Sequence, residues 1–138
     1  MRDRAILIVD DEESLRFTFE MFLRREGYEQ VRVAATLGEA IELINSHSFD
    51  LIISDIVLEG DKGTDLLRHI RETGITCPVV MITGFPNLDS ASEAVRYGAF
   101  DYLPKPVTKE KLLRIVSQAL KYRELEREKQ ELIRKNER

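Results

Sequence analysis

The chain has 138 residues, 43% of them hydrophobic and 33% charged, with a net charge of −4 at pH 7. This length suits one domain that buries enough apolar surface to fold without a disulfide or a structural metal. The single cysteine, Cys77, excludes an internal disulfide and fits a reducing compartment. No apolar stretch approaches the roughly 20 residues of a membrane span, and the first residues lack a signal-peptide pattern. We therefore expect a cytoplasmic protein with no membrane partner.

Charge is unevenly distributed along the chain. Residues 121–138 carry seven basic and five acidic side chains, whereas residues 1–120 carry 14 basic and 20 acidic ones. An acidic body argues against nucleic acid as a direct partner. The basic C-terminal segment has no Gly or Pro and alternates its signs, which is typical of a solvated helix.

Short apolar runs alternate with helical patterns from the first residues onward. The predicted strands are Ala5–Val9, Val31–Ala34, Leu51–Ser54, Val79–Ile82 and Tyr102–Leu103. The helices predicted to follow them are Leu15–Arg25, Leu37–Asn45, Asp65–Glu72, Asp89–Tyr97 and the residues from Lys109 onward. This alternation predicts an α/β fold, in which a doubly wound parallel sheet has helices on both faces. Arg32 interrupts the second apolar run, so we expect that strand at an edge.

Capping signals support these boundaries. Thr36 and Glu39 have the spacing of a capping box at the second helix, and Thr108 can cap the last one. Glycines stand just past three predicted helices, at positions 27, 74 and 98. A residue in the left-handed conformation commonly ends a helix, and glycine adopts it without strain.

The last helix is predicted to continue well past the domain. No helix breaker occurs between Lys109 and the end of the chain, so we expect an extended C-terminal helix. Leu125 and Leu132 lie seven residues apart, which suggests the start of a coiled coil, but a charged linker explains the segment equally well. We divide the chain into a domain at residues 1–120 and a helical linker at residues 121–138.

Polar residues stand where four of the predicted strands end. Asp10 and Asp11 follow the first strand, Asp55 the third, Thr83 the fourth and Lys105 the fifth. Ligand sites of open parallel sheets form outside the carboxyl ends of the strands. Each residue alone has an ordinary structural explanation, such as helix capping by Asp11, but their coincidence at these ends predicts a functional site.

These side chains suit phosphoryl chemistry. Carboxylates brought together repel one another and need a cation, and oxygen ligands favour Mg²⁺. Asp55 is an ionised oxygen nucleophile at neutral pH, and its attack on a phosphoryl group would form an acyl phosphate. Lys105 could pair with the carboxylate and then with a phosphate oxygen, to which Thr83 could donate its hydroxyl.

The motifs resemble those of the receiver domain of bacterial two-component response regulators, over about residues 4–120. They are Val9-Asp10-Asp11-Glu12, Asp55 with Gly63 eight residues on, Thr83-Gly84, and Tyr102-Leu103-Pro104-Lys105-Pro106. The resemblance implies a flavodoxin-like sheet of five strands in the order 2-1-3-4-5. Glu59, where proline is usual, and Gly84, where alanine is common, depart from the family pattern without removing a functional group.

The resemblance also assigns a role to each residue of the acidic site. It implies that Asp55 is the phosphoacceptor and that a sensor histidine kinase is the partner that supplies the phosphoryl group. Asp10, Asp11 and Asp55 would hold Mg²⁺ together with the backbone carbonyl of Val57. Lys105 would contact the phosphoryl group, and its bond to the following proline is expected to be cis.

The same resemblance implies how the site would control an output. Thr83 and Tyr102 would form a switch pair, and a homodimer would form through the face of helix four, strand five and helix five and through the C-terminal helix. The segment Gly98–Pro106 and the charged helix resemble the nitrogen-regulator class of sigma-54-dependent transcription activators. An output domain is absent from this chain, so we favour a receiver fragment over a stand-alone receiver or a receiver module of a hybrid kinase.

Two other classes of protein stay open at this point. An aspartyl-nucleophile phosphatase would use the same residue types, but it carries a second aspartate two residues after the nucleophile, where this chain has Val57. An interaction module that is never phosphorylated is the other alternative. We expect no enzyme beyond Mg²⁺-dependent self-phosphorylation and slow self-dephosphorylation.

Overall fold

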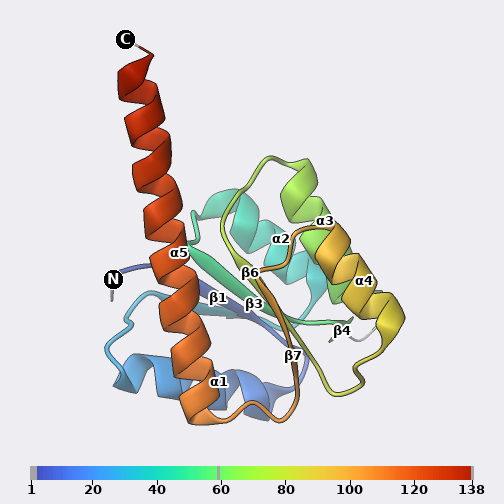
Figure 1. The fold of residues 1–138 in the computed structure, drawn as a ribbon. Coiled ribbons are helices and arrows are strands. Elements are labelled where there is room, and N and C mark those ends of the chain that lie inside the picture. The colour runs from blue at the N-terminus through green and yellow to red at the C-terminus, as the bar shows by residue number, and fades with distance from the viewer. Residues whose placement is uncertain (1–2, 59, 138) are drawn as a thin grey trace.

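The computed structural model describes residues 3–58 and 60–137, which form a five-stranded parallel sheet covered by helices (Figure 1). Its strands are β1 (Ile6–Val9), β2 (Val31–Ala34), β3 (Leu51–Asp55), β6 (Val79–Thr83) and β7 (Asp101–Pro104). They lie in the order β2-β1-β3-β6-β7, and every neighbouring pair is parallel. When only the strands of this sheet are numbered, β6 is the fourth and β7 the fifth. The order is then the predicted 2-1-3-4-5, with the second strand at an edge.

Five helices cover the two faces of the sheet. They are α1 (Glu13–Arg25), α2 (Leu37–Ser46), α3 (Gly63–Glu72), α4 (Leu88–Arg96) and α5 (Lys109–Asn136). One core packs α1 and α5 against the sheet, and the other packs α2, α3 and α4 against the opposite face. Alternate residues of each strand enter different cores: Ile6 and Ile8 face α1 and α5, while Leu7 and Val9 face the other side.

Helix ends follow the predicted signals. The Thr36 hydroxyl accepts a hydrogen bond from the Glu39 amide at 3.1 Å, and Thr108 accepts one from the Lys111 amide at the same distance. The glycines at positions 27, 74 and 98 all have positive φ. Local side chain–backbone chemistry therefore sets these boundaries, as expected.

One element of the structure was not predicted. Between β3 and α3 the chain forms a short antiparallel hairpin from β4 (Val57–Leu58) and β5 (Asp61–Lys62). Strands of two residues carry too little periodicity to be recognised in a sequence. Glu59, which departs from the family pattern, lies outside the described residues.

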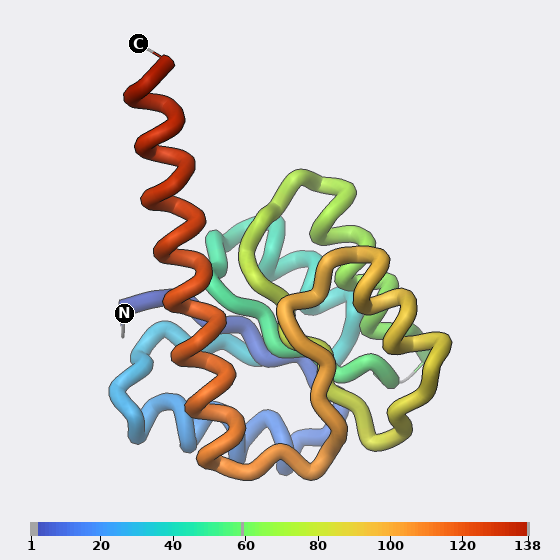
Figure 2. Tube along the Cα trace, viewed as in Figure 1, coloured from blue at the N-terminus to red at the C-terminus, as the bar shows by residue number. Residues whose placement is uncertain are grey.

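Helix α5 is continuous from Lys109 to Asn136, which confirms the predicted extended helix. Its 28 residues span about 42 Å at roughly 1.5 Å per residue. The buried side chains of α5 end at Leu120, and the last turns stand clear of the body in Figures 1 and 2. Within the described residues no helix combines the length and apolar character that crossing a membrane requires.

Candidate functional site

The predicted site residues lie together at the carboxyl edge of the sheet. Asp10 and Asp11 follow β1, Asp55 is the last residue of β3, Thr83 ends β6, and Lys105 follows β7. Since these strands are parallel and adjacent, their ends fall at one edge, on both sides of the point where the strand order reverses. The topology therefore brings together residues from 10 to 105 in the sequence.

Three carboxylates form a cluster at this edge. Asp10, Asp11 and Asp55 each present an oxygen, and these oxygens all lie within 4.8 Å of one another. Asp10 and Asp55 are buried, with 0% and 4% of their surface exposed, while Asp11 is more accessible. Three negative charges at this spacing, two of them shielded from water, favour a bound cation.

One buried oxygen of the cluster accepts no hydrogen bond. Asp10 Oδ1 accepts from the Glu12 amide at 2.9 Å, and Asp55 Oδ1 accepts from the Val57 amide at 3.0 Å. Asp10 Oδ2 is buried and makes no hydrogen bond. A buried carboxylate oxygen without a hydrogen bond is costly, so the donor set fits a divalent cation such as Mg²⁺.

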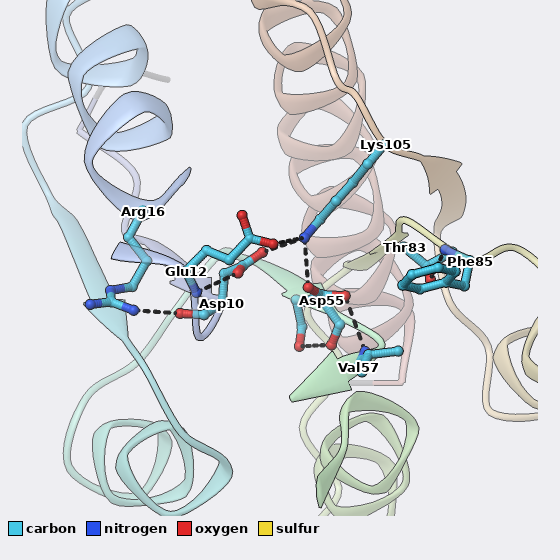
Figure 3. Close-up of polar contacts among 9 residues, drawn as sticks. Asp10, Glu12, Arg16, Asp55, Val57, Thr83, Phe85 and Lys105 are labelled. Atoms are coloured by element: carbon cyan, nitrogen blue, oxygen red, sulfur yellow. Dashed lines mark hydrogen bonds and ion pairs between the residues drawn. The ribbon is translucent and has the colours of Figure 1, made fainter. Parts of the chain in front are cut away.

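Lys105 supplies positive charge to the cluster (Figure 3). Its Nζ lies 2.7 Å from Asp55 Oδ2, 3.1 Å from Asp10 Oδ2 and 3.6 Å from Glu12 Oε1. The contact with Asp55 is a hydrogen bond, whereas the contact with Asp10 is an ion pair without hydrogen-bond geometry. One ammonium group thus faces three carboxylates, and the Lys105–Pro106 bond beside it is cis, as predicted.

Burial and neighbouring charges shift two pKa values here. Burial raises the pKa of Asp10 from 3.8 to about 6; Asp55 adds to this rise, and the Glu12 amide and Lys105 oppose it. Burial acts to lower the pKa of Lys105, but its contacts with Asp55 and Asp10 outweigh burial and raise it above 10.5. Lys105 is therefore cationic at neutral pH, and Asp10 ionises at a higher pH than an exposed aspartate does.

Gly63 allows the start of α3 to approach the backbone at Asp55. A Cβ atom at this position would lie 1.9 Å from the Asp55 carbonyl oxygen and 2.9 Å from Ile56 Cα. The Gly63 amide donates to the Ile56 carbonyl at 2.6 Å. This contact with fixed backbone explains the glycine eight residues after Asp55, since no larger residue fits.

The predicted switch residues are engaged away from the carboxylates. Thr83 is buried, and its hydroxyl oxygen accepts from the Phe85 amide at 3.0 Å. The Tyr102 hydroxyl oxygen accepts from the Asn87 amide at 3.2 Å and lies 2.7 Å from Ser90 Oγ. Tyr102 is therefore held at the first turn of α4, whereas Thr83 stands at the sheet edge beside the site.

Sequence reasoning assigned no role to two residues that contact the cluster. Glu12 pairs with Lys105, and Arg16 Nη1 donates to the Asp10 carbonyl at 2.8 Å (Figure 3). Arg16 comes six residues after Asp10. This spacing alone does not predict a contact, because the contact depends on how the chain turns from β1 into α1. Glu12 stood within the quoted acidic motif and offered the better signal.

This chain belongs to the response regulator receiver domain family, whose model matches residues 6–117. It is 39% identical over 128 residues to the response regulator protein PilR of Pseudomonas aeruginosa, covering 93% of this chain and 28% of that protein. It is 35% identical over 125 residues to the DNA-binding transcriptional regulator NtrC of Proteus hauseri, covering 90% and 26%. The chain thus spans about a quarter of the length of these curated relatives.

Solved structures agree with this assignment. A CheY-like receiver domain protein from Methanospirillum hungatei superposes with a TM-score of 0.86 at 34% identity, covering 90% of this chain and 98% of that one. NtrX from Brucella abortus gives 0.85 at 35% identity, covering 94% and 29%. The family and fold predicted from the sequence are therefore confirmed, and regulators of the nitrogen-regulator class are among the relatives.

Proposed function

We propose that this chain is a phosphorylation-activated switch, in which Asp55 accepts a phosphoryl group from a phosphohistidine of a sensor kinase. The observation that carries the proposal is the environment of Asp55, a buried carboxylate with two acidic neighbours and the Lys105 ammonium 2.7 Å away. Such a group is fixed by the backbone and lies next to a cation that can stabilise charge on a phosphoryl group.

The transfer is a displacement at phosphorus. A carboxylate oxygen of Asp55 attacks the phosphoryl group and forms a P–O bond, while the P–N bond to the histidine breaks and its ring nitrogen keeps the electron pair. Asp10, Asp11 and Asp55, with the Val57 carbonyl, would hold Mg²⁺, which neutralises charge on the phosphoryl oxygens. Lys105 exchanges part of its pairing with Asp55 for a phosphoryl oxygen.

The switch pair converts this charge into movement of α4. Phosphorylation adds about −1.5 to −2 charges and new acceptor oxygens, to which the Thr83 hydroxyl can donate. Thr83 already accepts from Phe85, and the Asn87 side-chain amide donates to the Phe85 carbonyl at 3.2 Å. Asn87 and Ser90 in turn contact the Tyr102 hydroxyl. Movement of Thr83 toward the phosphoryl group therefore disturbs the contacts that hold Tyr102.

The output is control of a segment outside residues 1–138, with residues 1–120 as the receiver and 121–138 as a helical linker. Transcription is the favoured output, of the sigma-54-dependent class, because one relative is named a DNA-binding transcriptional regulator. Apolar side chains exposed on α4 and α5 support a homodimer through the α4, β7 and α5 face and the C-terminal helix. They are Leu88, Val95, Leu125 and Leu132.

No observation favours a phosphatase. The position two residues after Asp55 is Val57, whose side chain is apolar and 52% exposed, so it cannot act as a general acid or base. Apart from phosphoryl transfer from the sensor kinase, we propose only self-phosphorylation from small donors and slow self-dephosphorylation for this chain.

Intact-mass measurement with acetyl phosphate and Mg²⁺ tests the proposal. We expect the wild-type chain to gain the mass of one phosphoryl group, in a bond that hydroxylamine cleaves. Borohydride reduction followed by peptide mapping should place it at Asp55. Asp55→Asn should stay unmodified, and the exposed variant Asp61→Asn should react as the wild type does. Stoichiometric modification of Asp55→Asn would contradict the site, and no modification of the wild type would contradict the function.

A further inference from the structure

The segment of α5 just beyond Leu120 contacts the body through polar side chains, although no side chain there is fully buried. The buried stripe of this helix ends at Leu120, after Leu112, Ile115, Val116 and Ala119. Polar contacts continue for another two turns, through Arg123, Glu124 and Arg127. They lie at the amino edge of the sheet, opposite the phosphoacceptor site.

Asp50 is the centre of these contacts. It is buried directly before β3, and its Oδ2 accepts from the Ala5 amide at 2.9 Å. Its other oxygen, Oδ1, lies 3.1 Å from Arg127 Nη2 and 3.6 Å from Arg123 Nε. One carboxylate thus joins the start of β1, the start of β3 and two turns of α5. Arg123 Nε is buried without a hydrogen bond, so the negative charge of Asp50 compensates the cost of burying this cationic group.

Two further contacts hold the same turns of the helix. Arg4 pairs with Glu124, and the N-terminal segment passes beside α5 in Figure 2. Arg123 Nη1 donates to Thr76 Oγ1 at 3.3 Å. Residues that precede β1, β3 and β6 therefore all contact this part of α5.

Beyond Arg127 the helix stands off the body. The ion pair found farther along α5 joins Arg134 to Glu131 within the helix. An open groove of about 680 Å³ runs along α5 from Tyr122 to Arg134, and Ile75 and Pro78, in the loop that leads into β6, line its body side. The last ionic contact between α5 and the described part of the body is thus that of Arg127.

We propose that Asp50, Arg123 and Arg127, with the Arg4–Glu124 pair, form a collar that fixes the direction of the projecting helix. The structural unit of the receiver then ends at Arg127 and not at Leu120. The collar joins the helix to the three central strands whose opposite ends carry Asp10, Asp55 and Thr83. The collar thereby sets the angle at which the projecting turns leave the sheet. This inference does not depend on phosphorylation.

Spin-label distances measured by double electron–electron resonance test the collar. Labels are placed at Glu42→Cys on α2 and Lys135→Cys near the end of α5, in a Cys77→Ala background diluted with unlabelled protein. Asp50→Asn keeps the acceptor for the Ala5 amide but removes the charge that holds both arginines. We expect it to broaden the distance distribution about twofold, because helix direction becomes less restricted. The matched control Glu131→Gln, which breaks only the pair within the helix, should leave the width unchanged.

Exchanging the charges of Arg4 and Glu124 distinguishes loss of the collar from nonspecific destabilisation of the fold. Arg4→Glu and Glu124→Arg should each broaden the distribution, and the double variant should restore it. Arg127→Gln, at a half-exposed position, replaces Asp50→Asn if that variant does not fold, and should broaden the distribution as well. Wild-type width in both Asp50→Asn and Arg127→Gln, or equal broadening by Glu131→Gln, would overturn the collar.

Hydrogen exchange of the wild-type chain tests the boundary separately. Backbone amides of residues 121–127 should exchange at rates close to those of residues 112–120, and those of residues 131–137 at least about tenfold faster. Equal rates in residues 121–127 and 131–137 would place the boundary back at Leu120.

Discussion

The negative charge of Asp10 is unfavourable in the folded protein. It is fully buried, its pKa is raised to about 6, and one of its oxygens makes no hydrogen bond. Lys105 compensates part of this penalty, but a single ammonium group is shared among Asp10, Glu12 and Asp55. The metal-free site therefore stores unfavourable free energy that a divalent cation can relieve.

Removing the charge of Asp10 should stabilise the metal-free protein. Asp10→Asn keeps the acceptor for the Glu12 amide and removes the repulsion with Asp55. Two pKa units near neutral pH correspond to about 1–3 kcal/mol of added unfolding free energy. Urea unfolding without metal measures this gain, and added Mg²⁺ should then stabilise the wild type but not the variant. The surface variant Glu72→Gln should behave as the wild type. A destabilised Asp10→Asn chain would contradict the argument.

The difference between wild type and Asp10→Asn should depend on pH. A carboxyl group whose pKa rises on folding, here from 3.8 to about 6, contributes stability below its unfolded pKa. That contribution is lost as pH rises through about 6. The advantage of Asp10→Asn should therefore grow between about pH 4 and 7, while Mg²⁺ affinity of the wild type rises over the same range. Unfolding and titration calorimetry at several pH values measure both. A difference that stays constant with pH would contradict the assignment to Asp10.

At the scale of elements, the start of α3 determines the backbone at the phosphoacceptor. Gly63 lies against the Asp55 carbonyl, and its amide bonds to the Ile56 carbonyl. The hairpin of β4 and β5 returns the chain to this contact after Asp55. The position of Asp55 therefore depends on two features. It is the last residue of β3, and its backbone contacts the backbone of Gly63.

A methyl group at this contact should displace the site. Gly63→Ala places a Cβ within 1.9 Å of a carbonyl oxygen, so α3 or the end of β3 must move. We expect a loss of about 1–3 kcal/mol in unfolding free energy, the usual cost of overpacking, and slower phosphorylation by acetyl phosphate.

Gly38→Ala is the matched control. This glycine lies in α2 with only ordinary contact at 4.0 Å, so alanine should stabilise the helix by about 0.5–1 kcal/mol. Chemical denaturation of both variants distinguishes the two environments. Equal effects of the two substitutions would mean that the close approach at Gly63 does not matter.

For the whole molecule, the projecting end of α5 presents an apolar stripe. Leu125, Leu132 and Ile133 are exposed there, and their spacing places them on one side of the helix. Arg123, Arg127 and Arg134 line the groove on a neighbouring side. The apolar stripe can therefore pack against α5 of a second copy of the chain, while the collar keeps α5 attached to its own receiver.

Polar substitution in this stripe should weaken association. If α5 pairs with its copy, Leu125→Gln/Leu132→Gln should lower the dimer association constant at least about tenfold, because two apolar side chains per chain stay in water. Sedimentation velocity with beryllofluoride and Mg²⁺ measures it. Lys121→Gln/Lys129→Gln changes the same helix without touching the leucines and should leave association within about threefold. A dimer that tolerates the leucine changes would instead implicate the α4 and β7 face.

Comparison of sequence and structure shows which contacts local patterns could not identify. Neither the hairpin of Val57–Leu58 with Asp61–Lys62 nor the close approach of Gly63 has a periodic signal. The Tyr102 contact with Ser90 and the Asp50 contacts with Arg123 and Arg127 join residues 12 to 77 positions apart. Such pairs are recognised only once the helices are placed, because charge and polarity alone do not select partners.

The sequence by itself determined the strands of the parallel sheet and the helices, because apolar periodicity and capping act over a few residues, and the resemblance of its motifs supplied the family and the strand order. It also indicated which acidic, hydroxyl and basic residues stand at strand ends, and parallel topology brings those ends together. Only the tertiary structure decided how one lysine is shared among three carboxylates and where α5 leaves the body. Both depend on distances between segments far apart in the chain, which are set when the two faces of the sheet are packed.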